Sequence, residues 1–290
     1  MPTRRTFLKT TVAGVAASGL AGAAAPLPAS APRRGIPPLR QSVCRWPFGG
    51  MPLDAFCTMV RDLGFGAVDL VDQGDWATVR RHGLAVSTAN SSPRRDFIAK
   101  GLNDPANHAM ILAELESVIP AAQAAGIPNV IAMFGNRVDG IDDAAAIANC
   151  AGALARIAPT AERHGVTVIL EMLNSRVDHR GFQGDTTPFG VAVCERVGSP
   201  RVRLLYDIYH MQIMEGDVIR TIRDNHQWFA HYHTAGNPGR NELSAHQELQ
   251  YGAIAEAIVA TGFTGWLAHE FMPTGDARAG LAQAREVVGG

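Results

Sequence analysis

Short apolar runs alternate with longer segments of helical periodicity through most of this chain. Runs of about four to eight apolar residues are typical of buried strands, and apolar positions three to four residues apart are typical of helices. These patterns predict strands over 41–44, 67–71, 84–89, 129–134, 166–171, 202–207, 228–233 and 265–270, and helices over 53–63, 76–82, 105–125, 142–164, 187–197, 218–225, 251–261 and 278–288.

This alternation predicts a parallel sheet whose outer face is covered by helices. Eight strand–helix units make a (β/α)8 TIM barrel, and the 290 residues of the chain exceed the roughly 250 that this fold needs. A doubly wound open sheet is the alternative. No G-x-G-x-x-G segment follows a predicted strand, which weakens that alternative.

The last four predicted strands each end on a side chain that can bind a metal: Glu171, Asp207, His233 and Glu270. In a TIM barrel the C-terminal ends of the strands converge on one mouth, where active sites lie. Three carboxylates meeting there would repel one another unless a divalent cation lay between them. Taken singly, Glu171 and Glu270 read equally well as solvated loop residues and His233 as a core histidine. A lone Asp207 would be costly in its apolar and aromatic setting without a partner, and the shared position of the four residues favours one metal site.

We therefore predict one divalent metal ion held by these four residues. Oxygen ligands with one imidazole suit Mn²⁺ or Mg²⁺, and Co²⁺ also fits. Two carboxylates on opposite sides of such an ion can move protons, so Glu171 and Glu270 are the candidates for the catalytic base and acid. The metal would hold a carbonyl and its neighbouring hydroxyl, and would stabilise the enediolate formed when the α-proton leaves.

Two further residues are candidates for substrate binding. His210 lies one helical turn beyond Asp207 and could hydrogen-bond a substrate oxygen; a surface histidine at a helix start is the alternative. Arg240 lies in a turn-rich loop after the seventh strand and could clamp a carboxylate, phosphate or hydroxyl, with a solvated arginine as the alternative. His231 is predicted to fill the barrel core rather than bind metal.

The N-terminal region has the features of a twin-arginine export signal. Arg4-Arg5 precedes Phe-Leu-Lys, a mildly apolar stretch and several Ala-x-Ala sites. We predict a signal over 1–25, a Pro-rich linker over 26–38 and the barrel domain over 39–290, which implies a periplasmic or extracellular protein. A disordered N-terminus with an accidental arginine pair is the alternative.

Composition narrows the class of partner. Hydrophobic residues make up 47% and charged residues 18%, an ordinary globular balance, and no stretch reaches the roughly 18 uncharged apolar residues of a membrane span. Removal of 1–25 takes away three basic residues and no acidic one, so the formal charge changes from −1 to −4 and a nucleic-acid partner is disfavoured. The four cysteines form no Cys-x-x-Cys pair, which leaves a zinc ribbon unsupported and their disulfide status open.

Four segments carry a family resemblance: Leu-Glu-Met-Leu-Asn at 170–174, Tyr-Asp-Ile-Tyr-His-Met-Gln at 206–212, Ala-Gly-Asn-Pro-Gly-Arg at 235–240 and Gly-Trp-Leu-Ala-His-Glu-Phe at 265–271. They are similar to the hydroxypyruvate isomerase family, within the xylose isomerase-like TIM-barrel superfamily. The resemblance implies that Glu171, Asp207, His233 and Glu270 bind the metal and that the two glutamates donate and accept protons. The isomerases usually carry Gln at the position of His233, whereas the related ketose 3-epimerases carry His.

The leading expectation is a metal-dependent isomerase that interconverts a small hydroxy-aldehyde and hydroxy-ketone, as in the conversion of hydroxypyruvate to tartronate semialdehyde. The alternatives are a ketose 3-epimerase, a lyase or hydrolase acting on an exported keto-sugar, and a sugar-binding protein without turnover. The expected partner is a small hydroxy-carbonyl compound or sugar, and a homo-oligomer is compatible with the sequence.

Overall fold

The computed structural model describes residues 39–289 of the chain. The predicted export signal and linker therefore lie outside the described residues. Within the described range, no helix is long and apolar enough to cross a membrane.

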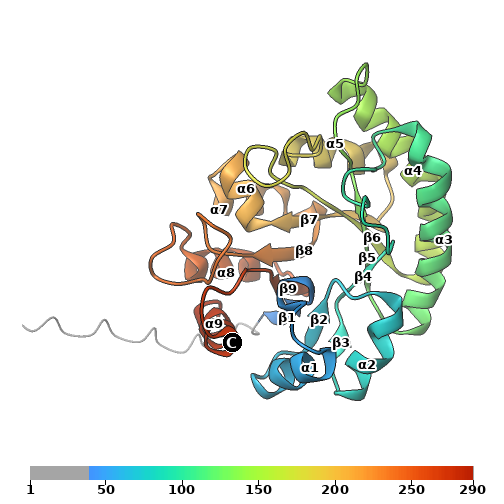
Figure 1. Ribbon diagram of the computed structural model, residues 1–290. Coiled ribbons are helices and arrows are strands. Elements are labelled where there is room, and N and C mark those ends of the chain that lie inside the picture. Colours follow the sequence, from blue (N-terminus) through green and yellow to red (C-terminus); the bar gives the residue numbers. More distant parts are fainter. Residues whose placement is uncertain (1–38, 290) are drawn as a thin grey trace, which may run out of the picture. The chain divides into compact units, whose positions relative to one another are not determined.

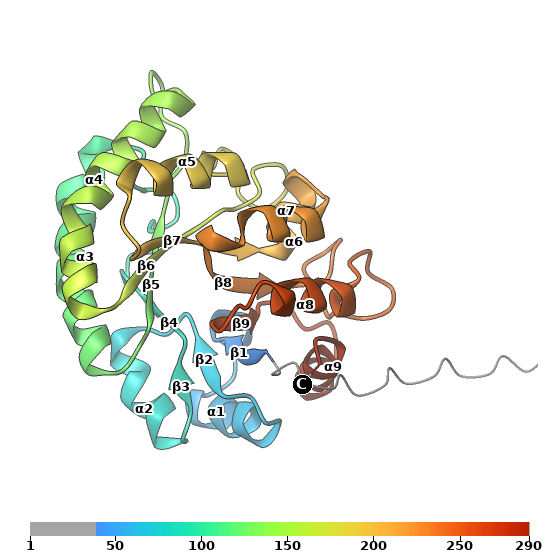
Figure 2. The same ribbon diagram turned by 180° about the vertical axis from the view of Figure 1, so that it is seen from behind.

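Parallel strands form one nine-stranded sheet in the order β3-β2-β1-β9-β8-β7-β6-β5-β4. Helices cover its outer side, as Figures 1 and 2 show from opposite directions. The strands are β1 Arg40–Cys44, β2 Ala67–Asp69, β3 Ala85–Val86, β4 Thr88–Asn90, β5 Asn129–Met133, β6 Thr167–Glu171, β7 Val202–Asp207, β8 Phe229–Thr234 and β9 Trp266–His269.

The nine strands correspond to the eight expected ones, because the predicted third strand, 84–89, is interrupted at Ser87. Its first part, β3, pairs with β2, and its second part, β4, pairs with β5. A parallel bridge between Val71 and Ala89 connects the two ends of the sheet. The prediction of a (β/α)8 barrel is thus confirmed, whereas the prediction of an unbroken third strand is wrong.

The helices are α1 Leu53–Asp62, α2 Trp76–Arg81, α3 His108–Ala124, α4 Asp143–His164, α5 Thr187–Val197, α6 Ile208–Met214, α7 Val218–Asn225, α8 Tyr251–Ala260 and α9 Ala277–Val287. The longest, α4, shows why the predicted bounds are close. The Asp142 carboxylate accepts a hydrogen bond from the Ala145 amide at 2.8 Å, and Gly165 ends the helix with a left-handed φ of 65°.

One helix, α6, is absent from the sequence prediction, and it lies next to the site. The Asp207 carboxylate ends β7 and also caps α6, accepting the amides of Tyr209 at 2.8 Å and His210 at 3.3 Å. One residue therefore ends a strand, starts a helix and turns the chain across the C-terminal mouth of the barrel.

Candidate metal centre at the strand ends

The four strand-end residues come together at the C-terminal mouth of the barrel. Glu171 ends β6, Asp207 ends β7, His233 lies on β8 and Glu270 directly follows β9. Each is buried, and one ligand atom from each lies within 4.8 Å of the others. Because the strands are parallel and in register, with Asp207 beside His233, their terminal side chains converge.

Two carboxylate oxygens in this cluster have no hydrogen-bond partner among the described residues. They are Oε1 of Glu171 and Oδ2 of Asp207. Burial raises the pKa of the Glu171 carboxyl, and the nearby Glu270 raises it further. Burial, followed by the charge of Glu270, raises the pKa of Asp207 to about 8. Buried carboxylate oxygens without hydrogen bonds are costly, and a divalent cation would stabilise the charged forms of both groups, so the donor set fits a metal.

His233 turns its two ring nitrogens toward different groups. Nδ1 lies 3.0 Å from Oε2 of Glu270 and 3.3 Å from Oε1 of Glu171. Nε2 lies 3.0 Å from Oδ2 of Asp69, a carboxylate at the end of β2 with no exposed surface. Burial lowers the pKa of His233, but its contacts with Cys44, Glu270 and Asp69 raise that pKa well above its ordinary value, so the ring of the metal-free protein is protonated. Once the Nδ1 proton is lost, an Nε2–H that donates to Asp69 leaves the Nδ1 lone pair directed toward the two glutamates. That lone pair suits a metal placed between them.

Asp69 belongs to the site and is absent from the sequence prediction. Besides His233, it contacts Nε2 of His231 at 3.2 Å, and the Ser87 hydroxyl donates a short hydrogen bond to it. The predicted second strand extends to Val71, whereas β2 ends at Asp69. In the sequence Asp69 stands inside the apolar run 67–71 rather than at its end, so it lacks the signal that identified Glu171 and Asp207.

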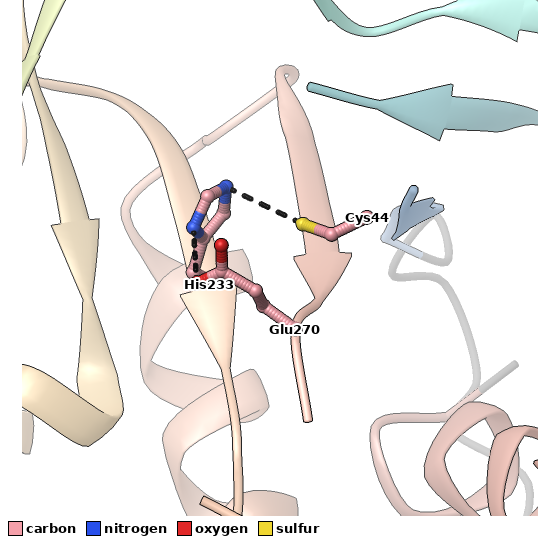
Figure 3. A group of neighbouring side chains, drawn as sticks. All are labelled: Cys44, His233 and Glu270. Carbon is pink, nitrogen blue, oxygen red and sulfur yellow. Dashed lines mark hydrogen bonds and ion pairs between the residues drawn. The ribbon is translucent and has the colours of Figure 1, made fainter. Parts of the chain in front are cut away.

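A thiol also lies against His233 and Asp69. Figure 3 shows Cys44 of β1, His233 and Glu270 directed toward one another. Sγ of Cys44 lies 3.9 Å from Nε2 of His233 and 3.5 Å from Oδ2 of Asp69. Burial raises the pKa of this thiol well above its ordinary value, so the sulfur is protonated and serves as a weak donor to Asp69.

Arg240 contacts the same oxygen of Glu270 as His233 does. Its guanidinium is 2.5 Å from Oε2 of Glu270 and 3.6 Å from Oδ2 of Asp207, and it stacks 5.1 Å from the centre of the Trp46 ring. Burial would raise the pKa of Glu270, but the Arg240 charge and His233 hold it well below its usual range. Trp46 Nε1 also donates to Oε1 of Glu270 at 2.6 Å. Glu270 is therefore an ionised and firmly positioned carboxylate.

His210 is buried beside the cluster with one nitrogen free. The Asn174 amide donates to Nδ1 of His210 at 2.6 Å, so the proton of the neutral ring is on Nε2. Nε2 has no hydrogen-bond partner among the described residues and lies 3.5 Å from Oδ2 of Asp207. Burial, and next the charge of Arg240, hold the pKa of His210 well below its ordinary value. A neutral N–H donor is thus available at the site.

A cavity of about 330 Å³ opens onto these groups, and Glu171, Arg240 and Glu270 form part of its wall. The sequence model of the xylose isomerase-like TIM-barrel family matches residues 57–287 of this chain. The chain belongs to this family.

Two curated relatives of this TIM-barrel chain match about a third of it. A 2-oxo-tetronate isomerase from Cupriavidus necator is 33% identical over 100 residues, which are 34% of this chain and 38% of the relative. The hydroxypyruvate isomerase of Escherichia coli is 32% identical over 104 residues, which are 36% of this chain and 40% of the relative. The resemblance inferred from the motifs is confirmed, and the matched region spans less than half of each relative.

Two solved structures share the fold with this family member. The AP endonuclease, family 2, from Brucella melitensis has a TM-score of 0.74 at 23% identity and covers 84% of this chain and 97% of its own. An L-ribulose 3-epimerase has a TM-score of 0.70 at 23% identity and covers 87% and 93%, respectively. At these identities the two structures establish the barrel and leave the reaction to be argued from the site.

Proposed function

We propose that this protein is a metal-dependent isomerase that interconverts a small hydroxy-ketone and hydroxy-aldehyde, with hydroxypyruvate to tartronate semialdehyde as the leading reaction. One observation carries the proposal. Two buried glutamates, Glu171 and Glu270, face each other beside Nδ1 of His233 and open onto one cavity. The names of the two curated relatives agree with this chemistry.

In this proposal Glu171, Asp207, His233 and Glu270 hold one divalent ion, Mn²⁺ or Mg²⁺, with Co²⁺ as a further fit. When bound, the ion supplies Lewis acidity that polarises the substrate carbonyl and its neighbouring hydroxyl. It also keeps Glu171 and Asp207 ionised against the effect of burial.

The side chains then move the proton. Glu270 is held ionised by Arg240, and it accepts the proton from the hydroxyl-bearing carbon. The electron pair released from that C–H bond forms the enediolate. Glu171, ionised at the start, takes the proton of the substrate hydroxyl, whose oxygen becomes the new carbonyl, and delivers that proton to the former carbonyl carbon. Glu270 returns its proton to the former carbonyl oxygen, which becomes the new hydroxyl and completes the exchange of positions.

Two neighbouring residues bind the substrate in this scheme. His210 donates its Nε2–H to a substrate oxygen and, being neutral, adds no charge to the metal cluster. Arg240 faces the cavity with its guanidinium, a planar donor suited to a substrate carboxylate.

A ketose 3-epimerase is the second candidate, and His233 favours it. The family resemblance associates His at this position with the epimerases and Gln with the isomerases. Two glutamates on opposite faces of one carbon would remove a proton from one face and return one to the other. The same side chains therefore serve either reaction, and the substrate's position relative to Glu171 and Glu270 decides which occurs.

We also propose that the chain is exported, on the strength of the Arg4-Arg5 segment and the apolar stretch behind it. The twin-arginine pathway carries folded proteins, so a metal loaded in the cytoplasm would travel with the barrel.

The test is proton–deuterium exchange followed by NMR. Mn²⁺-loaded protein is incubated in D₂O with hydroxypyruvate and a panel of ketoses, beside Glu270→Gln and the exposed control Glu116→Gln. We expect substrate deuteration with wild type and Glu116→Gln, and a loss of at least about 10²-fold with Glu270→Gln. Identification of the product separates isomerisation from epimerisation. Full exchange by Glu270→Gln would refute the assigned role.

A further inference from the structure

A second group of potential metal ligands lies beside Nε2 of His233, the ring nitrogen that faces away from the glutamates of the first site. It consists of Asp69 on β2, His231 on β8 and His233 itself, and one ligand atom from each lies within 4.8 Å of the others. None of these side chains has exposed surface. Cys44 on β1 is equally buried, and Figure 3 shows its sulfur directed toward His233.

His231 is the member of this group whose polar atoms lack partners. Its side chain is fully buried, and neither ring nitrogen makes a hydrogen bond within residues 39–289. Nε2 is nevertheless only 3.2 Å from Oδ1 of Asp69, so the two atoms are close without the alignment of a donor and an acceptor. A buried polar group left unpaired costs about 1–3 kcal/mol. Two ligand atoms that approach one another without a hydrogen bond are expected where both face a common ion.

The separations between the other ligand atoms fit a tetrahedral zinc ion. Bonds of about 2.0–2.1 Å to nitrogen or oxygen and about 2.3 Å to sulfur place tetrahedral ligand atoms about 3.3–3.6 Å apart. Oδ2 of Asp69 lies 3.0 Å from Nε2 of His233 and 3.5 Å from Sγ of Cys44. The sulfur lies 3.9 Å from Nε2 of His233. Shifts of a few tenths of an ångström would bring these atoms to bonding distance of one ion.

The donor set differs from that of the first site. Two imidazoles, a thiol and one carboxylate form the combination that zinc prefers in proteins. The first site offers three carboxylates and one imidazole, which suit Mn²⁺ or Mg²⁺. The two groups of ligands therefore select different ions.

We propose a second metal site, selective for Zn²⁺, whose ligands are Cys44, Asp69, His231 and His233. His233 bridges the two ions, with Nδ1 toward the first and Nε2 toward the zinc. Zinc binding displaces the proton of the Cys44 thiol and the Nε2 proton that otherwise goes to Asp69. This second site does not depend on the reaction proposed above, so each can fail without the other.

The first experiment counts metal ions. Full-length protein is produced in zinc-supplemented medium, dialysed against EDTA and examined by elemental analysis. We expect one zinc ion per chain to remain, because the second site is fully buried whereas the first opens onto a cavity of about 330 Å³. Mn²⁺ added afterwards should bind as one further ion. Complete loss of zinc from the wild-type protein would overturn the proposal.

Two substitutions separate the sites. His231→Gln removes a ligand of the second site alone, so zinc should bind at least about 10²-fold more weakly and be lost to EDTA. The same variant should still bind one Mn²⁺ ion, which also shows that its barrel is intact. Asp207→Asn should keep its zinc, because Asp207 belongs only to the first site. Zinc retained by His231→Gln would overturn the proposal.

Cobalt tests the thiol ligand directly. Co²⁺ taken up in place of zinc during expression gives a thiolate-to-metal charge-transfer band in the near ultraviolet when a cysteine is bound. The wild-type protein should show this band after dialysis, and so should Cys150→Ser, in which a buried thiol of α4 is replaced. Cys44→Ser should lose the band and still bind Mn²⁺. An unchanged band in Cys44→Ser would show that the sulfur is not a ligand and would overturn the proposed donor set.

Discussion

The hydrogen bond between Asp69 and His233 gives the sharpest prediction for the metal centre. Both side chains are fully buried, and Oδ2 of Asp69 lies 3.0 Å from Nε2 of His233. The carboxylate fixes the tautomer that leaves Nδ1 free for the metal, and it makes the imidazole more basic. Replacing Asp69 with Asn keeps the shape and removes the charge.

Substitutions of such supporting carboxylates weaken metal binding by about 10- to 100-fold, or about 1.4–2.7 kcal/mol. Isothermal titration of metal-free protein with Mn²⁺ should show this loss for Asp69→Asn. The exposed control Asp139→Asn makes the same charge change outside the cluster and should bind as wild type does. Thermal unfolding of each metal-free variant checks that the barrel persists. An unchanged Kd in folded Asp69→Asn would refute the argument.

Three further outcomes follow from the same groups. Because the pKa of Asp207 is raised to about 8, Mn²⁺ binding should release protons, and the affinity measured by titration should rise with pH up to about 8. The folded-state pKa values of Glu171 and Asp207 lie above their unfolded values, so these groups favour the metal-free fold most at low pH. Their contribution to the stability of the metal-free fold is lost as the pH rises. The Tm measured in EDTA should therefore fall between about pH 5 and about pH 8, and the Tm of the Mn²⁺-bound protein should fall much less over the same range. His210→Phe should lower kcat for exchange by about tenfold or more, because it removes the N–H that donates to a substrate oxygen. The Kd for Mn²⁺ should stay within about threefold of the wild-type value, because His210 is not a metal ligand in this account. A matching loss of metal affinity would contradict that assignment.

The sequence predicts the barrel well because burial controls its strands. Parallel strands covered on both faces appear as continuous apolar runs, and in β6 and β7 a single acidic residue marks where each run reaches the mouth. Helices with clear signals, such as α4 with Asp142 before it and Gly165 after it, are predicted to within a residue or so. Their bounds depend on local interactions that sequence reveals directly.

Other features depend on contacts between distant segments. The interruption at Ser87 arises where two ends of the sheet meet, which no local pattern records. The α6 segment is short and mostly apolar, so its periodicity is weak, and its start is set by the cap from Asp207. Asp69 is 164 positions from His233, and only the closed barrel places them in contact. The predicted second strand ran past Asp69 because Leu70 and Val71 continue the apolar pattern.

The central claim is that one metal ion lies among Glu171, Asp207, His233 and Glu270. Crystals of the protein saturated with Mn²⁺ would be measured for anomalous scattering from manganese. The account predicts one strong peak per chain, within bonding distance of Nδ1 of His233 and of all three carboxylates, and loss of that peak in Asp207→Asn. A peak between Asp69 and His231 instead, or no peak at saturating Mn²⁺, would contradict the account.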